Sequence, residues 1–492
     1  MSFRNCFLTS ALALSLSQAS SAAETLLQPS ESPLISFRIL FRTGAAADPE
    51  GKEGAASLTA AMLSEGGTAK RTYDQIVEQM FPMATSVDSQ VDKEMTVFAG
   101  STHVDNLEAY YSTLKEMLLE PGWREDDFRR LQDDAINFLR IGLRGNNEEE
   151  LGKETLYLTI YGPDHPYGHH NTGNVSTLQA MTIDDLKAFY AANYRSDNVV
   201  IGIAGGYPED FPARVKADFD ALPSGAPGPV ELPAPARTKK TSVHILQKDT
   251  RSTLLSIGFP IDVTRAHPDW PALKLMQSYF GQHRSSKSRL FQQIREIRGM
   301  NYGDYAYIEY FPEGMYQTQP DPNLARRQQI FQIWIRPVIP ENGPFALKIA
   351  LYELDKLIRE GISEEDFEST REFLSKYVNL LTQTQDDQLG YALDSEYYGT
   401  GEFNSWFKEK LNGLTREAVN KAIKDHLRAT DLDVIVITQD AAGFRRRILS
   451  NDARPVYATP PPQDVQAEDL LIRNYKLDLG AIEIVPAEHV FE

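Results

Sequence analysis

A proline-rich stretch near the middle of the chain separates two halves, because no regular element can run through it. Residues 223–235 read Pro-Ser-Gly-Ala-Pro-Gly-Pro-Val-Glu-Leu-Pro-Ala-Pro. Proline fixes φ and lacks an N–H donor, so this composition excludes a helix interior and a central strand. At 492 residues the chain also exceeds what one hydrophobic core normally supports. We therefore predict two domains, 24–222 and 241–445, joined by an extended linker at 223–240.

The order of helices in the first half recurs in the second. Residues 106–119 have apolar side chains at helical spacing and precede an acidic helix start that ends at Phe128. Residues 349–358 have the same spacing and precede an acidic helix start that ends at Phe367, 367 − 128 = 239 residues later. This order favours a duplicated domain, although chance remains an alternative explanation in a helix-rich chain.

A second pair of segments repeats at nearly the same offset. Thr182 precedes a helical stretch that leads to the apolar strand 199–203, and Thr415 precedes one that leads to the strand 434–437, with 415 − 182 = 233. Strand-like segments such as Leu34–Phe41 mix with these long helices. We predict an α+β fold of two homologous domains, each a mostly antiparallel sheet covered by helices.

Both ends of the chain are expected to lie outside these domains. Arg4 precedes an apolar run that starts at Phe7, and small residues follow, which is the layout of a secretory signal peptide over residues 1–23. We therefore predict a secreted protein, with the periplasm as the expected compartment. The tail 446–492 is polar and rich in proline, so we expect it to wrap over the second domain or a partner.

Charge, hydropathy and cysteine content bear on three expectations: nucleic-acid binding, membrane spans and disulfide bonds. The net charge is −19 at pH 7 and no basic cluster is interleaved with aromatic residues, so we expect no nucleic-acid partner. No stretch after the signal reaches the roughly 18 apolar residues that a membrane span requires. The single cysteine, Cys6, lies in the predicted signal, so packing without disulfides must stabilise the mature chain.

The first half contains the frame of a known metal-binding helix. A strand over 35–42 and the turn Thr43-Gly44 precede Gly-Ala-Ala-Ser-Leu-Thr-Ala-Ala-Met-Leu-Ser-Glu-Gly-Gly-Thr at 54–68. In this order the chain resembles the pitrilysin/insulinase (mitochondrial processing peptidase-like) family of zinc peptidases, whose helix carries Gly-x-Ala-His-x-x-Glu-His-Met-x-x-x-Gly-Thr. The resemblance covers most of the mature chain. It implies a clamshell of two domains around a chamber, here with one edge strand missing because little chain precedes Ile35.

The side chains that would bind zinc in this motif are absent. Ser57, Ala60 and Ala61 stand where the family has its first histidine, general-base glutamate and second histidine. Two histidines four residues apart share a helix face and a zinc ion, and alanine offers neither a lone pair nor a base. The family's third ligand, a glutamate, would fall within 131–141, where this sequence has none. The resemblance therefore implies a non-catalytic member that binds no zinc of its own.

Three histidines at His165, His169 and His170 suggest another metal site. Pro166 and Gly168 place them in a loop, and no carboxylate or cysteine stands at ligand spacing. We interpret them as residues that order a helix junction, and the remaining histidines as isolated surface or packing residues.

The second half retains a pair of residues that the resemblance implies bind substrate. Arg295 and Tyr302 are 302 − 295 = 7 residues apart within Leu-Phe-Gln-Gln-Ile-Arg-Glu-Ile-Arg-Gly-Met-Asn-Tyr. In the family an arginine and a tyrosine at this spacing hold the peptide backbone near the scissile bond. Both side chains can donate hydrogen bonds to a carbonyl or an oxyanion. The alternative is a solvated arginine and a packed tyrosine.

The resemblance implies a role as a partner subunit. In the two-chain branch of the family one subunit carries the zinc motif and the other carries the arginine and tyrosine. We therefore predict a non-catalytic, peptide-binding subunit of a secreted zinc metalloendopeptidase, with zinc in the homologous partner and peptides added to a sheet edge. Two alternatives stay open: a stand-alone peptide-binding or scaffold protein, and a metallopeptidase with an unrecognised metal site.

Overall fold

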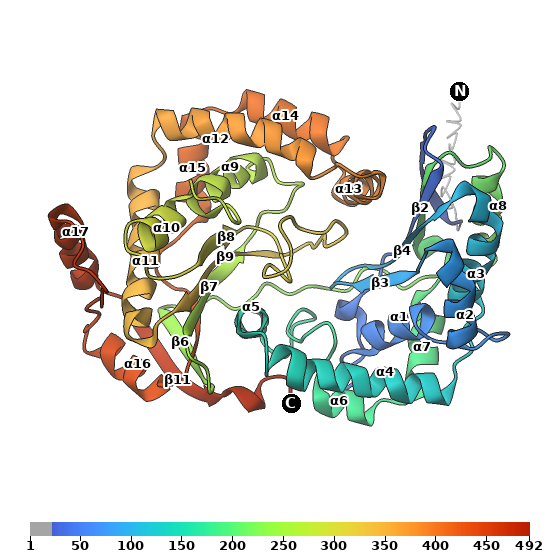
Figure 1. Ribbon diagram of the computed structural model, residues 1–492, viewed down its shortest axis with the longest axis horizontal. Helices are drawn as coiled ribbons and strands as arrows, with labels where there is room; N and C mark the ends of the chain where they lie inside the picture. Colours follow the sequence, from blue (N-terminus) through green and yellow to red (C-terminus); the bar gives the residue numbers. More distant parts are fainter. Residues whose placement is uncertain (1–21) are drawn as a thin grey trace, which may run out of the picture.

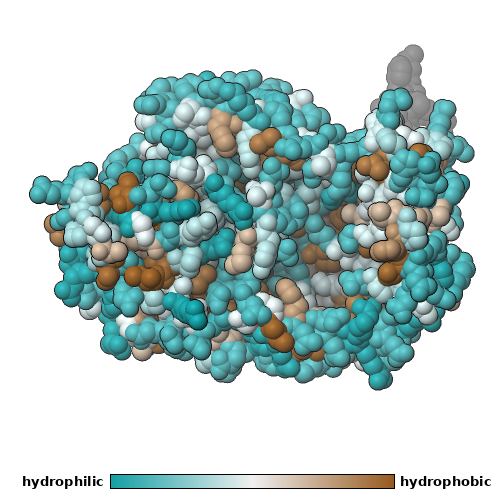
Figure 2. All heavy atoms as spheres, in the orientation of Figure 1, coloured by the Kyte–Doolittle hydropathy of each residue, from teal (hydrophilic) through white to brown (hydrophobic). Residues whose placement is uncertain are grey.

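The computed structural model describes residues 22–492, which form two α+β halves with a hollow between them (Figures 1 and 2). The first half runs from blue to green in Figure 1 and the second from yellow-green to red. The predicted signal peptide lies outside the described residues, apart from its last two positions. Within the described part of the chain, no helix combines the length and the apolar character that crossing a membrane requires.

The first half is built on a five-stranded sheet. Its strand order is β1-β5-β2-β4-β3, antiparallel except for the parallel pair β1 and β5. The expectation that the first sheet lacks an edge strand is wrong, because β1 begins right after the predicted cleavage point and pairs along β5. This pairing uses main-chain groups, which any sequence supplies. The strands are β1 Glu24–Pro29, β2 Leu34–Phe41, β3 Asp88–Val91, β4 Thr96–His103 and β5 Val199–Gly205.

One face of this sheet packs against helices of its own half. Phe37 and Ile39 of β2 point into the resulting core, and both are fully buried. The predicted helix start at Thr182 is confirmed, since its side chain accepts a hydrogen bond from the Asp185 N–H in a capping box. The helices are α1 Ala55–Ser64, α2 Tyr73–Met80, α3 Leu107–Leu119, α4 Glu125–Asn137, α6 Val175–Ala180, α7 Ile183–Asn193 and α8 Phe211–Asp220.

The second half repeats this topology and adds a strand. Its order β6-β10-β7-β9-β8 matches β1-β5-β2-β4-β3, with β6 and β10 again parallel. Residues 223–240 before it contain no helix or strand. The added strand β11 comes from the tail and pairs in parallel with β6. The strands are β6 Thr241–Gln247, β7 Thr253–Ile261, β8 Gly303–Tyr307, β9 Gln329–Val338, β10 Asp433–Thr438 and β11 Leu479–Pro486.

The helices of the second half include the partners predicted from the repeat. Ser363 and Thr415 cap α12 and α15, as the sequence of each segment predicts. The tail helix α17 packs on α11. The helices are α9 Trp270–Gly281, α10 Arg289–Phe291, α11 Gly343–Glu360, α12 Glu364–Tyr377, α14 Phe403–Gly413, α15 Arg416–His426, α16 Ala441–Leu449 and α17 Gln463–Asn474.

Each half lends one helix to the sheet of the other. Helix α5 (Glu148–Tyr161) of the first half packs on β7 and β10, and α13 (Gln385–Tyr398) of the second half packs on β2 and β5. The two helices start 385 − 148 = 237 residues apart, so the exchange obeys the same repeat. Arg38 of β2 donates to Asp386 at 2.9 Å, which fixes α13 on the first sheet. The halves are therefore interlocked.

Candidate functional site

Helix α1, which aligns with the zinc motif, is a packed core helix. Ala60 is fully buried, and Ala61 is partly buried against the same core. The Ser57 hydroxyl donates to the carbonyl oxygen of Asn171 at 2.6 Å. Two of the three motif positions thus carry only a methyl group, and the third is engaged by the main chain, so this helix presents no ligand set for zinc.

The segment expected to hold the third ligand gives no substitute. Helix α4 packs against α1, with Leu131 buried and Ala135 against the core. The helix then widens into a π-helical turn at Phe138–Leu143. The ring of Phe138 lies 5.9 Å from that of His170. The part of this segment that packs in the core is therefore apolar and supplies no glutamate at the position of the third ligand.

The three loop histidines beside this segment are held largely by main-chain groups. A carboxylate that the local spacing does not reveal also reaches one of them, because His169 Nε2 lies 3.2 Å from Asp48 Oδ2. Burial lowers the pKa of His170 to about 4, so its ring is neutral near pH 7. Such contacts fit residues that order a helix junction. The ring of His165 contacts the Tyr167 N–H and the Pro233 carbonyl oxygen. The ring of His169 contacts the Ala45 carbonyl oxygen, and that of His170 accepts from the Thr172 N–H.

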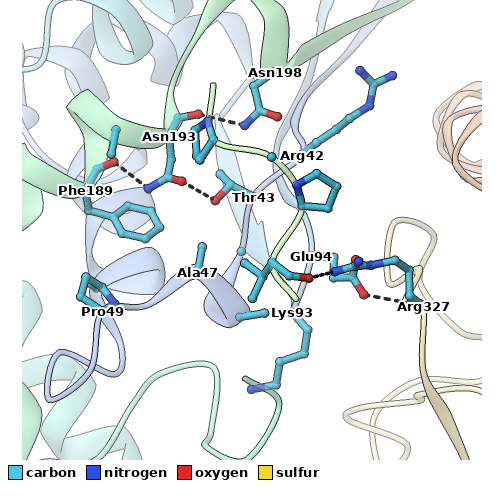
Figure 3. A pocket seen from close by; sticks show the side chains of 18 of the residues that line it. Arg42, Thr43, Ala47, Pro49, Lys93, Glu94, Phe189, Asn193, Asn198 and Arg327 are labelled. Carbon is cyan, nitrogen blue, oxygen red and sulfur yellow. Dashed lines mark hydrogen bonds and ion pairs between the residues drawn. The ribbon is translucent and has the colours of Figure 1, made fainter. Parts of the chain in front are cut away.

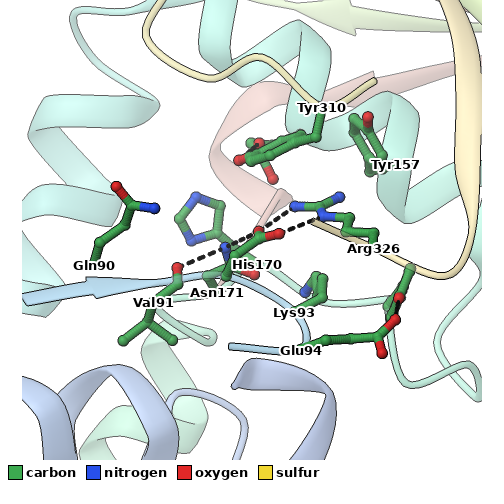
Figure 4. Close-up of polar contacts among 12 residues, drawn as sticks. Gln90, Val91, Lys93, Glu94, Tyr157, His170, Asn171, Tyr310 and Arg326 are labelled. Carbon is green, nitrogen blue, oxygen red and sulfur yellow. Dashed lines mark hydrogen bonds and ion pairs between the residues drawn. The ribbon is translucent and has the colours of Figure 1, made fainter. Parts of the chain in front are cut away.

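A buried ion pair beside α1 connects the two halves (Figure 4). Asp92, which follows β3, accepts a hydrogen bond from Arg326 Nε at 2.7 Å, and both side chains are at most 2% exposed. The guanidinium lies 3.6 Å from the ring centre of Tyr310. Asn171 donates to the Val91 carbonyl at 3.1 Å and to Asp92 at 3.2 Å. The second half thus supplies a structural charge next to the altered motif.

Strand β3 forms the edge of the first sheet next to α1. The Ser89 hydroxyl lies 3.0 Å from that of Ser64, the last residue of α1. The carbonyl of Val91 points away from β4, toward Asn171. In a strand, residues two apart direct their main-chain groups to the same side, so Ser89 directs its N–H and C=O away from β4 as well. This edge can pair with an added strand at Ser89.

The predicted substrate-binding residues lie together at the start of β8, the edge strand of the second sheet. Arg295 Nη1 donates to the Tyr302 carbonyl at 3.2 Å. The guanidinium lies 4.3 Å from the ring centre of Tyr302 and 4.7 Å from that of Phe291. Tyr302 is 70% exposed, so its hydroxyl is available to a ligand. The alternative of a packed tyrosine is therefore excluded, and the guanidinium and the phenol ring lie side by side.

A cavity of about 820 Å³ opens between the halves near the linker (Figure 3). Asn193 accepts from Thr43 at 3.2 Å and donates to the Phe189 carbonyl at 3.0 Å. Burial lowers the pKa of Lys93, at the cavity wall, to about 8. The sequence did not indicate this cavity, because its walls come from segments far apart in the chain. They include Thr43, Glu94, Asn193, Pro227, Arg327 and Tyr397, but neither Arg295 nor Tyr302.

Family models match both halves of the chain. The model described as insulinase (peptidase family M16) matches residues 26–138, and the model described as peptidase M16 inactive domain matches residues 180–374. The second match begins in α7 and ends in α12, so it includes Arg295 and Tyr302.

Several curated proteins are similar to this chain. An uncharacterized zinc protease of Bacillus subtilis is 22% identical over 362 residues, which are 71% of this chain and 82% of that protein. An uncharacterized zinc protease of Streptomyces coelicolor is 24% identical over 61% of this chain and 62% of its own length. The mitochondrial-processing peptidase subunit beta of Neurospora crassa is 25% identical over 34% of each chain. The chain thus spans less than two thirds of some of these relatives.

Solved structures share the fold. A peptidase M16 inactive domain from Pseudomonas fluorescens superposes with a TM-score of 0.74 at 22% identity, covering 85% of this chain and 96% of that one. The first half of the periplasmic protease PqqL from Escherichia coli gives a TM-score of 0.68 at 14% identity, covering 94% and 97%. These likenesses show the fold, and the family matches in both halves show that the chain belongs to the insulinase (peptidase M16) family, as a member without the zinc-binding side chains of the family motif.

Proposed function

We propose that this chain is a non-catalytic, peptide-binding subunit that acts together with a homologous zinc-bearing peptidase. One observation carries the proposal: the helix of the zinc motif offers no ligands, whereas Arg295 and Tyr302 remain paired and accessible. Tyr302 is exposed and Arg295 is partly exposed beside a sheet edge, so both donors can reach a bound peptide.

In this proposal Arg295 and Tyr302 bind and orient the peptide. The guanidinium carries a fixed charge and is stacked between two rings, so little conformational freedom is lost when it donates to a peptide carbonyl. The exposed phenol of Tyr302 supplies a second donor. Zinc in the partner would supply an activated water, and the two donors of this chain would stabilise the negative charge that develops on the attacked carbonyl oxygen.

The edge at β3 supports strand addition as the mode of peptide binding. Ser89 directs its main-chain groups away from β4, and an extended peptide can pair with them without regard to its side chains. Such pairing predicts affinity with loose sequence preference. Secretion to the periplasm is proposed on the pattern of the first residues and on the likeness to a periplasmic protease.

The cavity near the linker supports a second candidate, a peptide-binding protein that acts without a catalytic partner. Its volume of about 820 Å³ lies within the range of pockets that hold small ligands or a few residues of a peptide. Sedimentation of the chain mixed with a zinc-bearing homologue separates the two candidates. A complex supports the subunit role, and two independent species support the stand-alone role.

Peptide binding by the purified chain tests the proposed site. Anisotropy of fluorescent peptides should show weaker binding by about tenfold for Arg295→Ala, because a charge-assisted hydrogen bond contributes about 1.5–3 kcal/mol. Tyr302→Phe should weaken it less. Arg359→Ala removes an exposed arginine on α11 and serves as the matched control. Affinity unchanged in the Arg295→Ala/Tyr302→Phe double variant would refute the assignment of the site.

A further inference from the structure

Three potential metal ligands from distant parts of the second half meet at its surface. His267 and Asp269 precede α9, and His426 ends α15. His426 Nε2 lies 2.8 Å from Asp269 Oδ2, and one ligand atom from each of the three residues lies within 4.8 Å of the other two. Over residues 22–492 no other trio of histidine, cysteine, aspartate or glutamate is gathered in this way.

The fold holds these side chains in place before any ion arrives. Helices α9 and α15 pack against each other, and Trp270, next to Asp269, is 1% exposed in the core. The rings of His267 and His426 cross at 86° with their centres 5.3 Å apart. His267 Nδ1 accepts a hydrogen bond from the Asp269 N–H at 3.1 Å. All three residues are half-buried, so water and ions still reach them.

The donor types select the class of ion. We propose that His267, Asp269 and His426 bind one divalent ion of the zinc class. Two imidazoles and one carboxylate suit Zn²⁺ and its neighbours, whereas Ca²⁺ and Mg²⁺ require mainly oxygen ligands. The carboxylate also offsets part of the charge of the ion. Binding replaces the direct contact between His426 and Asp269 by a bond from each to the ion.

The surroundings leave room for a further ligand. His267 lines a surface cavity of about 480 Å³ together with Asp262, Arg327 and the end of β7. Three protein ligands leave the fourth position of a tetrahedral ion to water or to a small anion. The site is separate from α1 and from the Arg295–Tyr302 pair, so it adds a metal to this chain without restoring the family motif. It also corrects the interpretation of these histidines as isolated residues.

Zinc titration of the mature chain, purified without a polyhistidine tag, tests the site. Calorimetry with zinc chloride should give one ion per chain, and Co²⁺ in its place should give a visible absorption band of a nitrogen- and oxygen-ligated ion. His267→Ala and His426→Ala should each lower the affinity by more than about tenfold, since losing even an outer-shell partner costs about 10–100-fold. The double variant should bind no ion.

The matched control is His103→Ala. His103 lies 3.3 Å from Asp105 but is not part of a trio, so its loss should leave zinc binding unchanged. Thermal melting of the zinc-free variants checks their fold, and Asp269→Asn supplies a milder variant if an alanine variant unfolds. A parent chain that binds no zinc, or a double variant that binds like the parent, overturns the proposal. Neither outcome bears on peptide binding, which is measured separately.

Discussion

At the level of single residues, the motif helix has been converted from a metal-binding helix to a packing helix. Ala60 fills a position with no exposed surface, and the Ser57 hydroxyl is bound to the loop at Asn171. Because protein interiors are close-packed, a larger side chain at such a position forces its neighbours to move. Ala60 is therefore part of the core, and we expect that restoring the side chains of the motif alone does not restore a metal site.

Restoring the motif by Ser57→His, Ala60→Glu and Ala61→His should destabilise the chain without creating a peptidase. Overpacking costs about 1–3 kcal/mol, and burying a carboxylate without a partner adds to this. Urea unfolding should show that the triple variant loses more than about 3 kcal/mol of unfolding free energy. The control Ser57→Ala, which removes one hydrogen bond, should lose about 1 kcal/mol. A triple variant as stable as the parent that hydrolyses peptides would contradict this view of the helix.

His170 should make the stability of the protein depend on pH. Burial lowers its pKa from the ordinary 6.5 to about 4, so the unfolded chain binds the proton first as pH falls. Stability is thus retained above pH 6.5 and lost progressively down to about pH 4, by about 3 kcal/mol from this group.

Unfolding free energies measured between pH 7 and pH 4 check this dependence. His170→Asn keeps an acceptor for the Thr172 N–H but does not titrate. The difference in unfolding free energy between the parent and this variant should therefore shrink as the pH falls from 7 to 4. His103→Asn, at an exposed histidine, should show the same change of unfolding free energy with pH as the parent. Equal slopes for His170→Asn and the parent would show that His170 does not carry the effect.

At the level of elements, the tail helix α17 is tied to the segment that carries the proposed substrate-binding pair. Arg298 lies between Arg295 and Tyr302, and its side chain is fully buried. It donates to Asp469 at 2.9 Å and to Glu468 at 2.7 Å, both on α17. Both carboxylates of the tail compensate the charge of this buried arginine, so the tail is expected to position this segment.

Asp469→Asn should therefore weaken both stability and peptide binding. Breaking a buried pair outright costs about 3–5 kcal/mol, and Asp469→Asn should cost part of this because Glu468 still pairs with Arg298. The exposed pair of Arg454 and Asp452 contributes about 0–1 kcal/mol. Asp452→Asn is the matched control and should change neither property. Peptide affinity measured at a temperature where both variants are folded separates positioning from unfolding. A destabilised Asp469→Asn with full affinity would argue that α17 has only a structural role.

The sequence predicts the elements that depend on local pattern and misses those that depend on distant partners. Thr182 and Thr415 reveal their helices through capping and spacing, which are local. Strand β1, with the sequence Glu-Thr-Leu-Leu-Gln-Pro, lacks the apolar run that marks β10 and is held by pairing with β5. The contact between His267 and His426 joins residues 426 − 267 = 159 apart, and nothing in either neighbourhood predicts it. The resemblance, rather than the spacing of the two residues, implies a shared role for Arg295 and Tyr302, and the two residues lie in contact.

At the level of the whole molecule, the two halves are interlocked. Helices α5 and α13 are exchanged between the sheets, and the Asp92–Arg326 pair is buried between the halves. The tail joins the second sheet as its edge strand β11 and then reaches the first half, where the Phe491 carbonyl accepts from the Val175 N–H at 3.0 Å. This arrangement suits a rigid subunit that holds one side of a shared chamber.

Peptide hydrolysis by the mature chain, alone and mixed with a secreted zinc-bearing homologue, is the measurement that tests this view most directly. The chain alone should be inactive, and the mixture should be active and sensitive to chelators. Activity of the mixture should fall with Arg295→Ala and with Tyr302→Phe but not with Arg359→Ala. Hydrolysis by the chain alone that a chelator abolishes, or a mixture no more active than the homologue by itself, would contradict the proposed role.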